Sequence, residues 1–196
     1  GEDLLSQLVM ARDEGQGMSE ALLRDEIVTL FVAGHETTSL ALTWTFYLLA
    51  AHPEARERLE AEVDGLSGEP LDLGGLERLA FTGRCLDEAM RLYPPAYALP
   101  RRVAEPVELG GFPLAPGDEV LMWIYHLHRH PRWFEAPETF DPDRFAPGSE
   151  RVRHPRAFIP FGAGSRTCIG RHFARFEALI LLARVARRYR LHRADG

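Results

Sequence analysis

The feature that most constrains this chain is a run of apolar residues at helical spacing that continues for about nine turns. The run extends from Leu22 to Leu49, Ser19 can act as its N-cap, and Pro53 ends it. It predicts one helix over residues 19–51, about 48 Å long at 1.5 Å per residue. Because this helix is apolar on nearly all sides, we expect it to run through the middle of the protein.

The centre of the predicted helix is polar, with the sequence GHETTS from Gly34 to Ser39. Hydrocarbon would penalise such side chains most strongly there, so we expect no membrane span in this chain. A zinc-protease motif would need a second His at position 39, where this chain has Ser. Glu36 and Thr37 are compatible both with a structural polar cluster and with a pair that delivers protons. The Thr37 hydroxyl can bond the carbonyl of the preceding turn and so open a groove beside the helix.

The rest of the chain predicts a mainly helical protein with a small amount of sheet. With 196 residues, 45% of them hydrophobic, the chain can bury one sizeable core or two small ones. Periodicity and turn signals predict further helices over residues 2–13, 54–63, 79–92 and 170–189, and strands at 107–109 and 119–123. We expect a Gly- and Pro-rich loop at 66–75 and an ordered irregular region at 131–167.

The charge of the chain is divided unevenly. The formal net charge is -6, yet residues 1–150 carry -15 and residues 151–196 carry +9. With His neutral, all of the positive side chains are Arg. Aromatic residues that could stack on bases are sparse in the basic part and the whole chain is acidic, so we expect no nucleic-acid binding. A basic C-terminal face fits an acidic protein partner better.

The residue usage also bears on the source and the compartment. The chain has neither Lys nor Asn, and both have AT-rich codons. This favours a bacterial source with a GC-rich genome over a heat-adapted source depleted in labile amides. The two cysteines make no disulfide framework, and no signal peptide is expected at Gly1. We therefore expect a reducing, cytoplasmic compartment.

Glu88 and Arg91 lie three residues apart in the sequence DEAMRLYPP, so they share one face of a predicted helix and can pair. One interpretation is a surface ion pair, which would contribute little. The apolar residues around them and the two prolines that follow favour a partly buried structural pair at least as much. Arg144, in the sequence DPDRF, is a candidate to complete such a network.

A single cysteine, Cys168, stands in the glycine-rich sequence FIPFGAGSRTCIGRHFA at residues 158–174. This sequence lacks the second Cys of a covalent haem attachment motif, and one thiolate cannot hold an iron-sulfur cluster. It is neither a dinucleotide fingerprint nor a phosphate loop, since it lacks the required Gly and Lys.

A lone metal-binding thiolate fits this position best. Cys168 lies just before the predicted last helix, whose dipole favours a thiolate, and the glycines free backbone N–H groups to point at the sulfur. Arg166 adds positive charge nearby. A cysteine nucleophile is the alternative, although no acid-oriented His is apparent as its base.

Three histidines, His126, His128 and His130, could suggest a second metal site in the sequence HLHRHPR. No carboxylate or Cys stands at ligand spacing, so we expect solvated or capping histidines. Cys85, in the middle of a predicted helix, is expected to be a small buried apolar residue.

Four motifs in one order resemble those of the cytochrome P-450 family of haem-thiolate monooxygenases. They are AGHETT, similar to the family's central-helix motif; EAMR, its Glu-x-x-Arg pair; PDRF, its aromatic-ending Arg motif; and FGAGSRTCIG, its haem-binding loop. The resemblance implies the C-terminal, haem-binding half of the P-450 fold, mainly α with a small β-sheet, and a haem-binding loop at residues 158–170. The N-terminal half of that fold and its final strands are expected to be absent from these 196 residues.

The resemblance also implies how a heme b cofactor would be held. Cys168 would be the axial thiolate on the iron, where it favours O–O cleavage, and Phe161 would shield the sulfur. Arg101 and Arg166 would pair with the haem propionates. The other cofactor-binding residues expected in the loop are Gly162, Gly164 and Gly170.

A pocket for O2 and an apolar small-molecule substrate is implied as well. Glu36 and Thr37 would relay protons to the dioxygen being cleaved, while Ala33 and Gly34 would line the pocket. Residues 96–99 would touch the substrate, in particular Tyr97, Ala98 and Leu99.

The same resemblance gives the triad of Glu88, Arg91 and Arg144 the role of holding the haem-binding loop. The basic C-terminal face would lie on the thiolate side of the haem, where an acidic ferredoxin, flavodoxin or flavin reductase domain docks. We thus expect a monooxygenase that activates O2 to oxidise an apolar small molecule. The alternative is a truncated, non-catalytic haem-binding fragment, and a cysteine hydrolase without haem is a third hypothesis.

Overall fold

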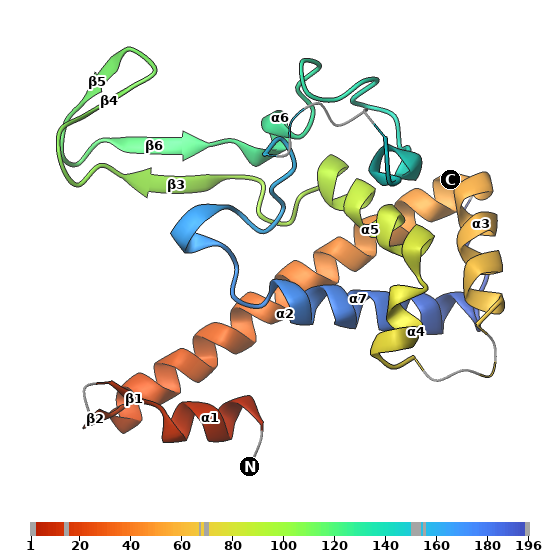
Figure 1. The fold of residues 1–196 in the computed structure, drawn as a ribbon, viewed down its shortest axis with the longest axis horizontal. Coiled ribbons are helices and arrows are strands. Elements are labelled where there is room, and N and C mark those ends of the chain that lie inside the picture. Colours follow the sequence, from red (N-terminus) through yellow and green to blue (C-terminus); the bar gives the residue numbers. More distant parts are fainter. Residues whose placement is uncertain are drawn as a thin grey trace.

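The structure is a computed structural model, and it describes residues 3–13, 16–66, 68, 71–149, 154 and 156–194. The helices are α1 (Leu4–Met10), α2 (Glu20–Ala51), α3 (Pro53–Asp64), α4 (Leu73–Glu77), α5 (Ala80–Leu92), α6 (Ile124–Leu127) and α7 (Arg171–Ala186), with 3-10 turns η1 (Pro142–Phe145) and η2 (Gly164–Arg166). The strands are β1 (Arg12–Asp13), β2 (Gln16–Gly17), β3 (Leu99–Arg102), β4 (Val107–Leu109), β5 (Phe112–Leu114) and β6 (Glu119–Met122). The predicted class, mainly α with a small amount of sheet, is confirmed (Figure 1).

The helix α2 has the length and the ends that the sequence predicts. Its N-cap is Ser19, whose hydroxyl oxygen accepts a hydrogen bond from the backbone N–H of Leu22 at 3.2 Å. The helix ends at Ala51, and Pro53 begins α3. Proline fits the first turn of a helix but not its interior, so it separates the two helices. Within the part of the chain that the structure describes, no helix is long and apolar enough to cross a membrane.

Only the C-terminal half of α2 is packed. Its buried residues begin at Thr38 and end at Leu49, and α3, α5 and α7 all contact this helix. Along the N-terminal half most side chains are exposed; Phe31, for example, is 72% exposed. The prediction that the helix runs through the middle of the protein is therefore wrong for this half. Of the described helices, α1 lies beside it (Figure 1).

The main core lies where α2, α3, α5 and α7 meet. The helix α5 is central to it, since ten of its residues are buried. The buried apolar residues that these four helices contribute include Leu48, Leu49, Leu59, Val63, Phe81, Cys85, Ala89, Leu92, Leu179 and Ala183. A second cluster joins α2, α5 and α7 through Ala41, Leu86, Met90, Ala178 and Leu182.

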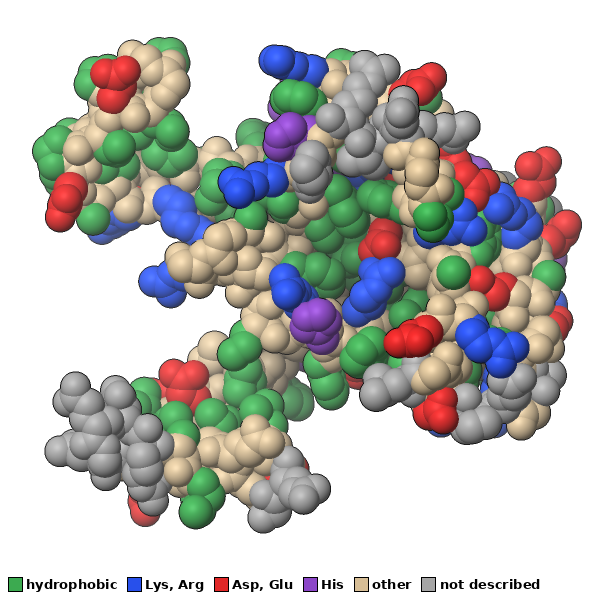
Figure 2. Space-filling model, viewed as in Figure 1, with side chains coloured by type: hydrophobic (Ala, Val, Ile, Leu, Met, Phe, Trp, Pro, Cys, Tyr) green, Lys and Arg blue, Asp and Glu red, His purple; other side chains and the backbone are tan. Residues whose placement is uncertain are grey.

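The strands β3 to β6 form an arm that projects from the helices (Figure 1). Antiparallel pairing joins β3 to β6, with Leu99 opposite Met122, and joins β4 to β5. Gly110 and Gly111, with φ of 60° and 86°, form the tight turn between β4 and β5, a conformation that favours glycine. This face of the molecule is hollowed between the arm and the N-terminal end of α2 (Figure 2).

The predicted boundaries hold for most elements but not for all. The strands predicted at 107–109 and 119–123 are confirmed as β4 and β6, the second one residue shorter. The helix predicted at 2–13 ends at Met10, and the chain then pairs as β1 and β2. The loop predicted at 66–75 contains α4, because Asp72 caps a short helix there.

Of the four strands in the arm, two, β3 and β5, are missing from the sequence prediction. Both are short and each contains a proline, Pro100 in β3 and Pro113 in β5. Proline cannot donate a ladder hydrogen bond and normally argues against a strand. Pairing with β6 and β4 forms these strands, and such pairing is not a local property of the sequence.

Candidate functional site

Cys168 lies in an exposed loop between η2 and α7. Its thiol is free, and its backbone N–H donates to the carbonyl oxygen of Phe161 at 2.9 Å. In a second contact within the loop, the hydroxyl of Thr167 donates to the carbonyl of Gly164 at 2.8 Å. Hydrogen bonds to its own backbone carbonyls therefore close the loop, and the sulfur is left accessible.

Two glycines give this loop its shape. Gly162 and Gly164 have φ of 73° and 74°, in the left-handed region that favours glycine. A Cβ placed on Gly162 would lie 3.7 Å from Cδ1 of Leu99, so the loop passes close to the start of β3. Gly170 is the N-cap of α7, and a Cβ there would lie 4.0 Å from Sγ of Cys168.

The phenylalanines of the loop anchor it to the helices. Phe158 and Phe161 are half-buried and pack against the cluster that includes Ala41 of α2. In Figure 1 the loop, drawn in blue, lies between the β3–β6 pair and α2. The structure thus places the predicted ligand loop beside the helix that carries the predicted proton-delivery residues.

Two arginines near the loop are exposed, Arg101 on β3 and Arg166 in η2. Arg101 donates to the carbonyl of Pro100 at 2.8 Å. Neither guanidinium forms an ion pair with a carboxylate of any described residue, so both remain available to an anionic group. Arginine binds such groups well because it presents a fork of N–H donors.

The predicted polar residues of α2 are not buried. Glu36 and Thr37 are exposed, as are Ala33 and Gly34, and a Cβ placed on Gly34 would meet nothing within 4 Å. The expectation that the helix runs through the middle of the protein is therefore wrong for these residues; Thr38 is the buried member of the stretch. The expected contact of Thr37 is present, since its hydroxyl donates to the carbonyl of Ala33 at 2.7 Å.

The segment that leads into β3 is also open. Tyr97 is 64% exposed, while Ala98 and Leu99 are half-buried. The carbonyl of Tyr97 accepts a hydrogen bond from the backbone N–H of Tyr125 at 3.0 Å, which ties this segment to α6.

Glu88 and Arg91 form a fully buried pair, each with 0% of its side chain exposed. Nε and Nη2 of Arg91 donate to the two carboxylate oxygens of Glu88 at 2.7 and 2.8 Å. Arg144 joins the pair, with its Nε 3.3 Å from Oε1 of Glu88. The structure brings together the three residues that the sequence singled out, and the alternative of a surface pair is excluded by their burial.

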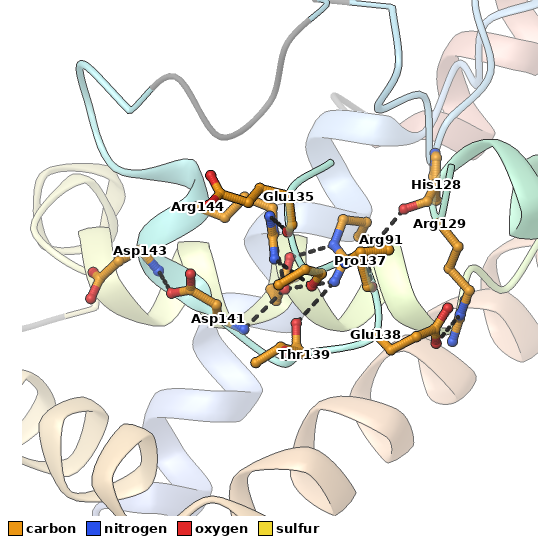
Figure 3. Close-up of polar contacts among 12 residues, drawn as sticks. Arg91, His128, Arg129, Glu135, Pro137, Glu138, Thr139, Asp141, Asp143 and Arg144 are labelled. Carbon is orange, nitrogen blue, oxygen red and sulfur yellow. Dashed lines mark hydrogen bonds and ion pairs between the residues drawn. The ribbon is translucent and has the colours of Figure 1, made fainter. Parts of the chain in front are cut away.

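The remaining donors of the two arginines meet backbone carbonyls (Figure 3). Arg91 donates to the carbonyls of His128, Pro137 and Thr139 at 3.0, 2.6 and 3.1 Å. Arg144 donates to the carbonyls of Glu135 and Ala136, at 2.5 and 3.2 Å. The two buried guanidinium groups therefore fix the irregular segment 128–141 by bonding its backbone carbonyls. Without these guanidinium groups, the same carbonyls would lack these hydrogen bonds.

His128 is not the solvated or capping residue that the sequence predicts. Its side chain is completely buried, and its Nε2 accepts a hydrogen bond from the backbone N–H of Ile159 at 3.0 Å. Burial lowers its pKa to about 4. His126 is exposed and His130 caps the N–H of Arg132, so the prediction holds better for its neighbours. The pattern of polar and apolar residues around position 128 in the sequence does not indicate that the His128 side chain is buried.

A bidentate ion pair between α5 and α7 was also missed. Arg175 donates to both carboxylate oxygens of Asp87, at 2.5 and 3.0 Å. Burial raises the pKa of Asp87, and Arg175 opposes that shift. Gly83 leaves room for the guanidinium, since a Cβ there would lie 3.0 Å from Nη2. The pair fixes the helix that follows Cys168. Residues 88 apart in the chain carry no local signal of such a contact.

The donor set around Cys168 fits a prosthetic group better than a bare metal ion. The described residues contain no cluster of three or more His, Cys, Asp or Glu that could hold a metal. A single thiolate supplies one ligand, so the other ligands must come from the group itself, as in haem. Arg101 and Arg166 suit the carboxylates that haem carries. Cys85 is a poor alternative, because burial raises the pKa of its thiol.

Comparison with known proteins decides the family. The sequence model described as Cytochrome P450 matches residues 1–196. The chain belongs to the cytochrome P450 family. Cyclooctatin synthase of Streptomyces melanosporofaciens is 43% identical over 197 residues, which cover 99% of this P450 chain and 43% of that protein. Cytochrome P450 4c3 of Drosophila melanogaster is 38% identical, with coverage of 97% and 36%.

Solved structures show the same P450 fold. A cyanobacterial CYP120A1 with retinoic acid bound matches with a TM-score of 0.93 and 34% identity, over 100% of this chain and 46% of that one. The heme domain of a cytochrome P450DA mutant matches with a TM-score of 0.87 and 36% identity, over 94% and 43%. The chain spans less than half the length of the relatives that it matches.

Proposed function

We propose that this chain supplies the thiolate side of a haem site in a monooxygenase that activates O2 and oxidises an apolar small molecule. The observation that carries the proposal is the exposed thiol of Cys168, held in a glycine-shaped loop beside α2. Membership of the cytochrome P450 family supports it.

We propose heme b as the cofactor, with Cys168 as its protein ligand. When bound, the haem iron supplies the site of O2 reduction, and electron donation from the thiolate favours O–O cleavage. Arg101 and Arg166 would hold the propionates, and Phe161 would pack beside the sulfur from its place against the core cluster. Gly162, Gly164 and Gly170 would keep the loop backbone close to the cofactor.

Glu36 and Thr37 are proposed to move protons. The Thr37 hydroxyl donates its hydrogen bond to the carbonyl of Ala33, so the lone pairs of its oxygen remain free to accept a hydrogen bond from a water. Glu36 is exposed and can exchange protons with solvent. The two residues can therefore act in series, with Glu36 as the source and Thr37 as the orienting group. Ala33 and Gly34, which are also exposed, would line the adjacent pocket together with Tyr97, Ala98 and Leu99.

The apolar character of the substrate is proposed from two observations. Tyr97 and Phe31 are exposed aromatic side chains, and one solved relative has retinoic acid, a largely apolar molecule, bound. An acidic redox donor is proposed from the positive charge of residues 151–196. A reducing, cytoplasmic compartment is proposed because both cysteines are free.

The reduced, CO-bound difference spectrum of the haem-loaded protein tests the ligand. A strongly red-shifted band is expected from the thiolate-ligated state. Cys168→Ala removes the sulfur and is expected to abolish the band, whereas Cys85→Ala, a matched loss of a buried thiol, is expected to retain it. A band that survives in Cys168→Ala would contradict the assignment.

A non-catalytic haem-binding fragment is the second candidate. It is favoured by the exposure of Glu36 and Thr37 and by the span of 36–46% of the relatives' lengths. The two candidates differ in one measurement. The enzyme oxidises an apolar probe with O2 and an electron donor, whereas the fragment shows the red-shifted band without any product.

A further inference from the structure

The buried ion network does not reach the loop of Cys168 directly. Among the described residues, Glu88, Arg91 and Arg144 make their polar contacts with one another and with the segment 128–141. None of these contacts falls on residues 158–168. Apolar packing of Phe158 and Phe161 joins the loop to α5, but a polar link between the network and the loop needs a residue that hydrogen-bonds both.

His128 contacts both. Its backbone carbonyl accepts from Nη1 of Arg91 at 3.0 Å, and its ring Nε2 accepts from the N–H of Ile159 at 3.0 Å. The ring is completely buried and packs beside Phe134 and Phe158, with centroids 6.5 and 5.2 Å away. Packing on two sides restricts the ring to the rotamer that meets Ile159.

The protonation state suits this contact. An amide N–H can donate to Nε2 only while that nitrogen carries no proton. Burial lowers the pKa of His128 to about 4, and the charges of Arg91 and Arg129 also disfavour the protonated ring. The imidazole is thus neutral at neutral pH. Because Nε2 accepts from Ile159, its proton is on Nδ1, which is buried and has no hydrogen-bond partner among the described residues.

The contact continues to the cysteine through the backbone. The carbonyl of Ile159 accepts from the N–H of Gly162 at 3.0 Å, and the carbonyl of Phe161 accepts from the N–H of Cys168 at 2.9 Å. Holding the amide of Ile159 therefore fixes the turn that carries Gly162, and that turn fixes the residue that bears the sulfur.

We propose that His128 is a positioning residue, which ties the Arg91 network to the cysteine loop and so fixes the direction of the Cys168 sulfur. The expected consequence at haem rests on the proposed function, but the hydrogen bonds that join His128 to the cysteine loop do not depend on that function. His128 itself would touch neither cofactor nor substrate.

The test compares two variants that differ in the acceptor at the position of Nε2. His128→Phe keeps a ring of similar shape but removes the acceptor, whereas His128→Gln offers an amide oxygen at about the same reach. Hydrogen exchange of the Ile159 amide is the direct readout. We expect about a tenfold faster exchange in His128→Phe, and near wild-type protection in His128→Gln.

The second readout is spectroscopic. In the haem-loaded protein, His128→Phe is expected to lose about half or more of the intensity of the red-shifted CO band. The lost intensity is expected at the wavelength of haem whose thiol is protonated or displaced. His128→Gln is expected to keep the red-shifted band. Phe134→Leu is the matched control, because it loosens the same packing without touching the acceptor. It is expected to lower the unfolding midpoint but to leave the Ile159 exchange and the band shape close to wild type.

Three results would overturn the proposal: unchanged Ile159 exchange in His128→Phe, an equal loss of the band in Phe134→Leu, or failure of Gln to rescue. If His128→Phe does not fold, His128→Asn replaces it, because its shorter amide does not reach Ile159. Failure of the proposed function is a separate outcome. In that case the wild-type protein shows no red-shifted band, while the Ile159 exchange still responds to His128.

Discussion

At the scale of single residues, the buried charges distinguish this chain from an ordinary helical core. Glu88, Arg91 and Arg144 have at most 2% of their surface exposed. Removal of such ions from water costs several kcal/mol each, and the structure offsets that cost with paired carboxylate and carbonyl oxygens. Loss of one partner leaves another charge buried and unpaired, so these positions should tolerate substitution poorly.

Substitution of Glu88→Gln removes the carboxylate that both arginines share. We expect the free energy of unfolding to fall by about 3–5 kcal/mol, because two guanidinium groups stay buried without a counter-charge. Asp25→Asn is the control, since Asp25 pairs with Arg24 at the surface, where the side chains are 66% and 74% exposed. That change should shift stability by less than about 0.5 kcal/mol. Urea unfolding measures both, and equal effects would contradict the network's role.

The titration of His128 predicts a pH dependence of stability. Its pKa is about 4 in the folded chain, against 6.5 for an unperturbed histidine, so the unfolded chain binds more protons between these limits. Stability should therefore be fully present above about pH 6.5 and decline as the pH falls toward 4, by up to about 1.4 kcal/mol per pH unit. Urea midpoints measured from pH 7.5 to 4.5 show this slope. His128→Gln should reduce it, while His126→Gln, at an exposed ring, should leave it unchanged.

At the scale of elements, local signals specify α2 at both ends, and its packing is decided elsewhere. Ser19 caps the start and Pro53 stops the end, as a reading of the sequence predicts. Short strands are different: β3 contains Pro100, and its strand conformation depends on β6, some twenty residues further on. Long periodic helices are therefore predictable from the sequence, and short paired strands are not.

The same substitution should have opposite effects in α2 and in the cysteine loop. Gly34→Ala places a methyl group in open space within a helix, and it should raise the free energy of unfolding by about 0.5–1 kcal/mol. Gly162→Ala forces a Cβ onto a residue with φ of 73°, and it should lower the free energy by about 1–2 kcal/mol. Thermal or urea unfolding of the two variants gives both signs. A stabilising Gly162→Ala would mean that the loop does not need its left-handed turn.

At the scale of the whole molecule, the charge asymmetry is only partly available for binding. Several arginines of the positive C-terminal quarter are paired within the protein, such as Arg175 with Asp87 and Arg190 with Glu60. Others are exposed and have no carboxylate partner among the described residues, including Arg166 and Arg171 on either side of Cys168. Part of the positive charge open to a partner thus lies on either side of the proposed ligand loop, and Arg184, Arg188 and Arg193 add more of it at and beyond the C-terminal end of α7.

An acidic electron donor should reduce the haem-loaded protein at a rate that falls with salt. Exposed charges are screened within about 8–10 Å at physiological ionic strength, so raising the salt weakens the attraction. Arg171→Glu should slow reduction further at low salt, whereas Arg102→Glu, on the strand β3 and already beside Glu119, should have a smaller effect. Stopped-flow reduction at several ionic strengths measures both. A rate indifferent to salt would contradict docking by charge.

The sequence by itself determined the helical class, the ends of α2, the single thiol in its glycine loop and the spacing that lets Glu88 and Arg91 pair, because short-range spacing and residue chemistry express these features locally. Arg144, 56 residues beyond Glu88, completes the buried network through a long-range contact. The tertiary structure alone decided that Glu36 and Thr37 are exposed and that His128 is buried against Ile159, 31 residues away. Burial and long-range hydrogen bonds depend on which distant segments pack together. The chemistry of a side chain is fixed by its own atoms, but its environment is fixed by neighbours that lie far along the chain.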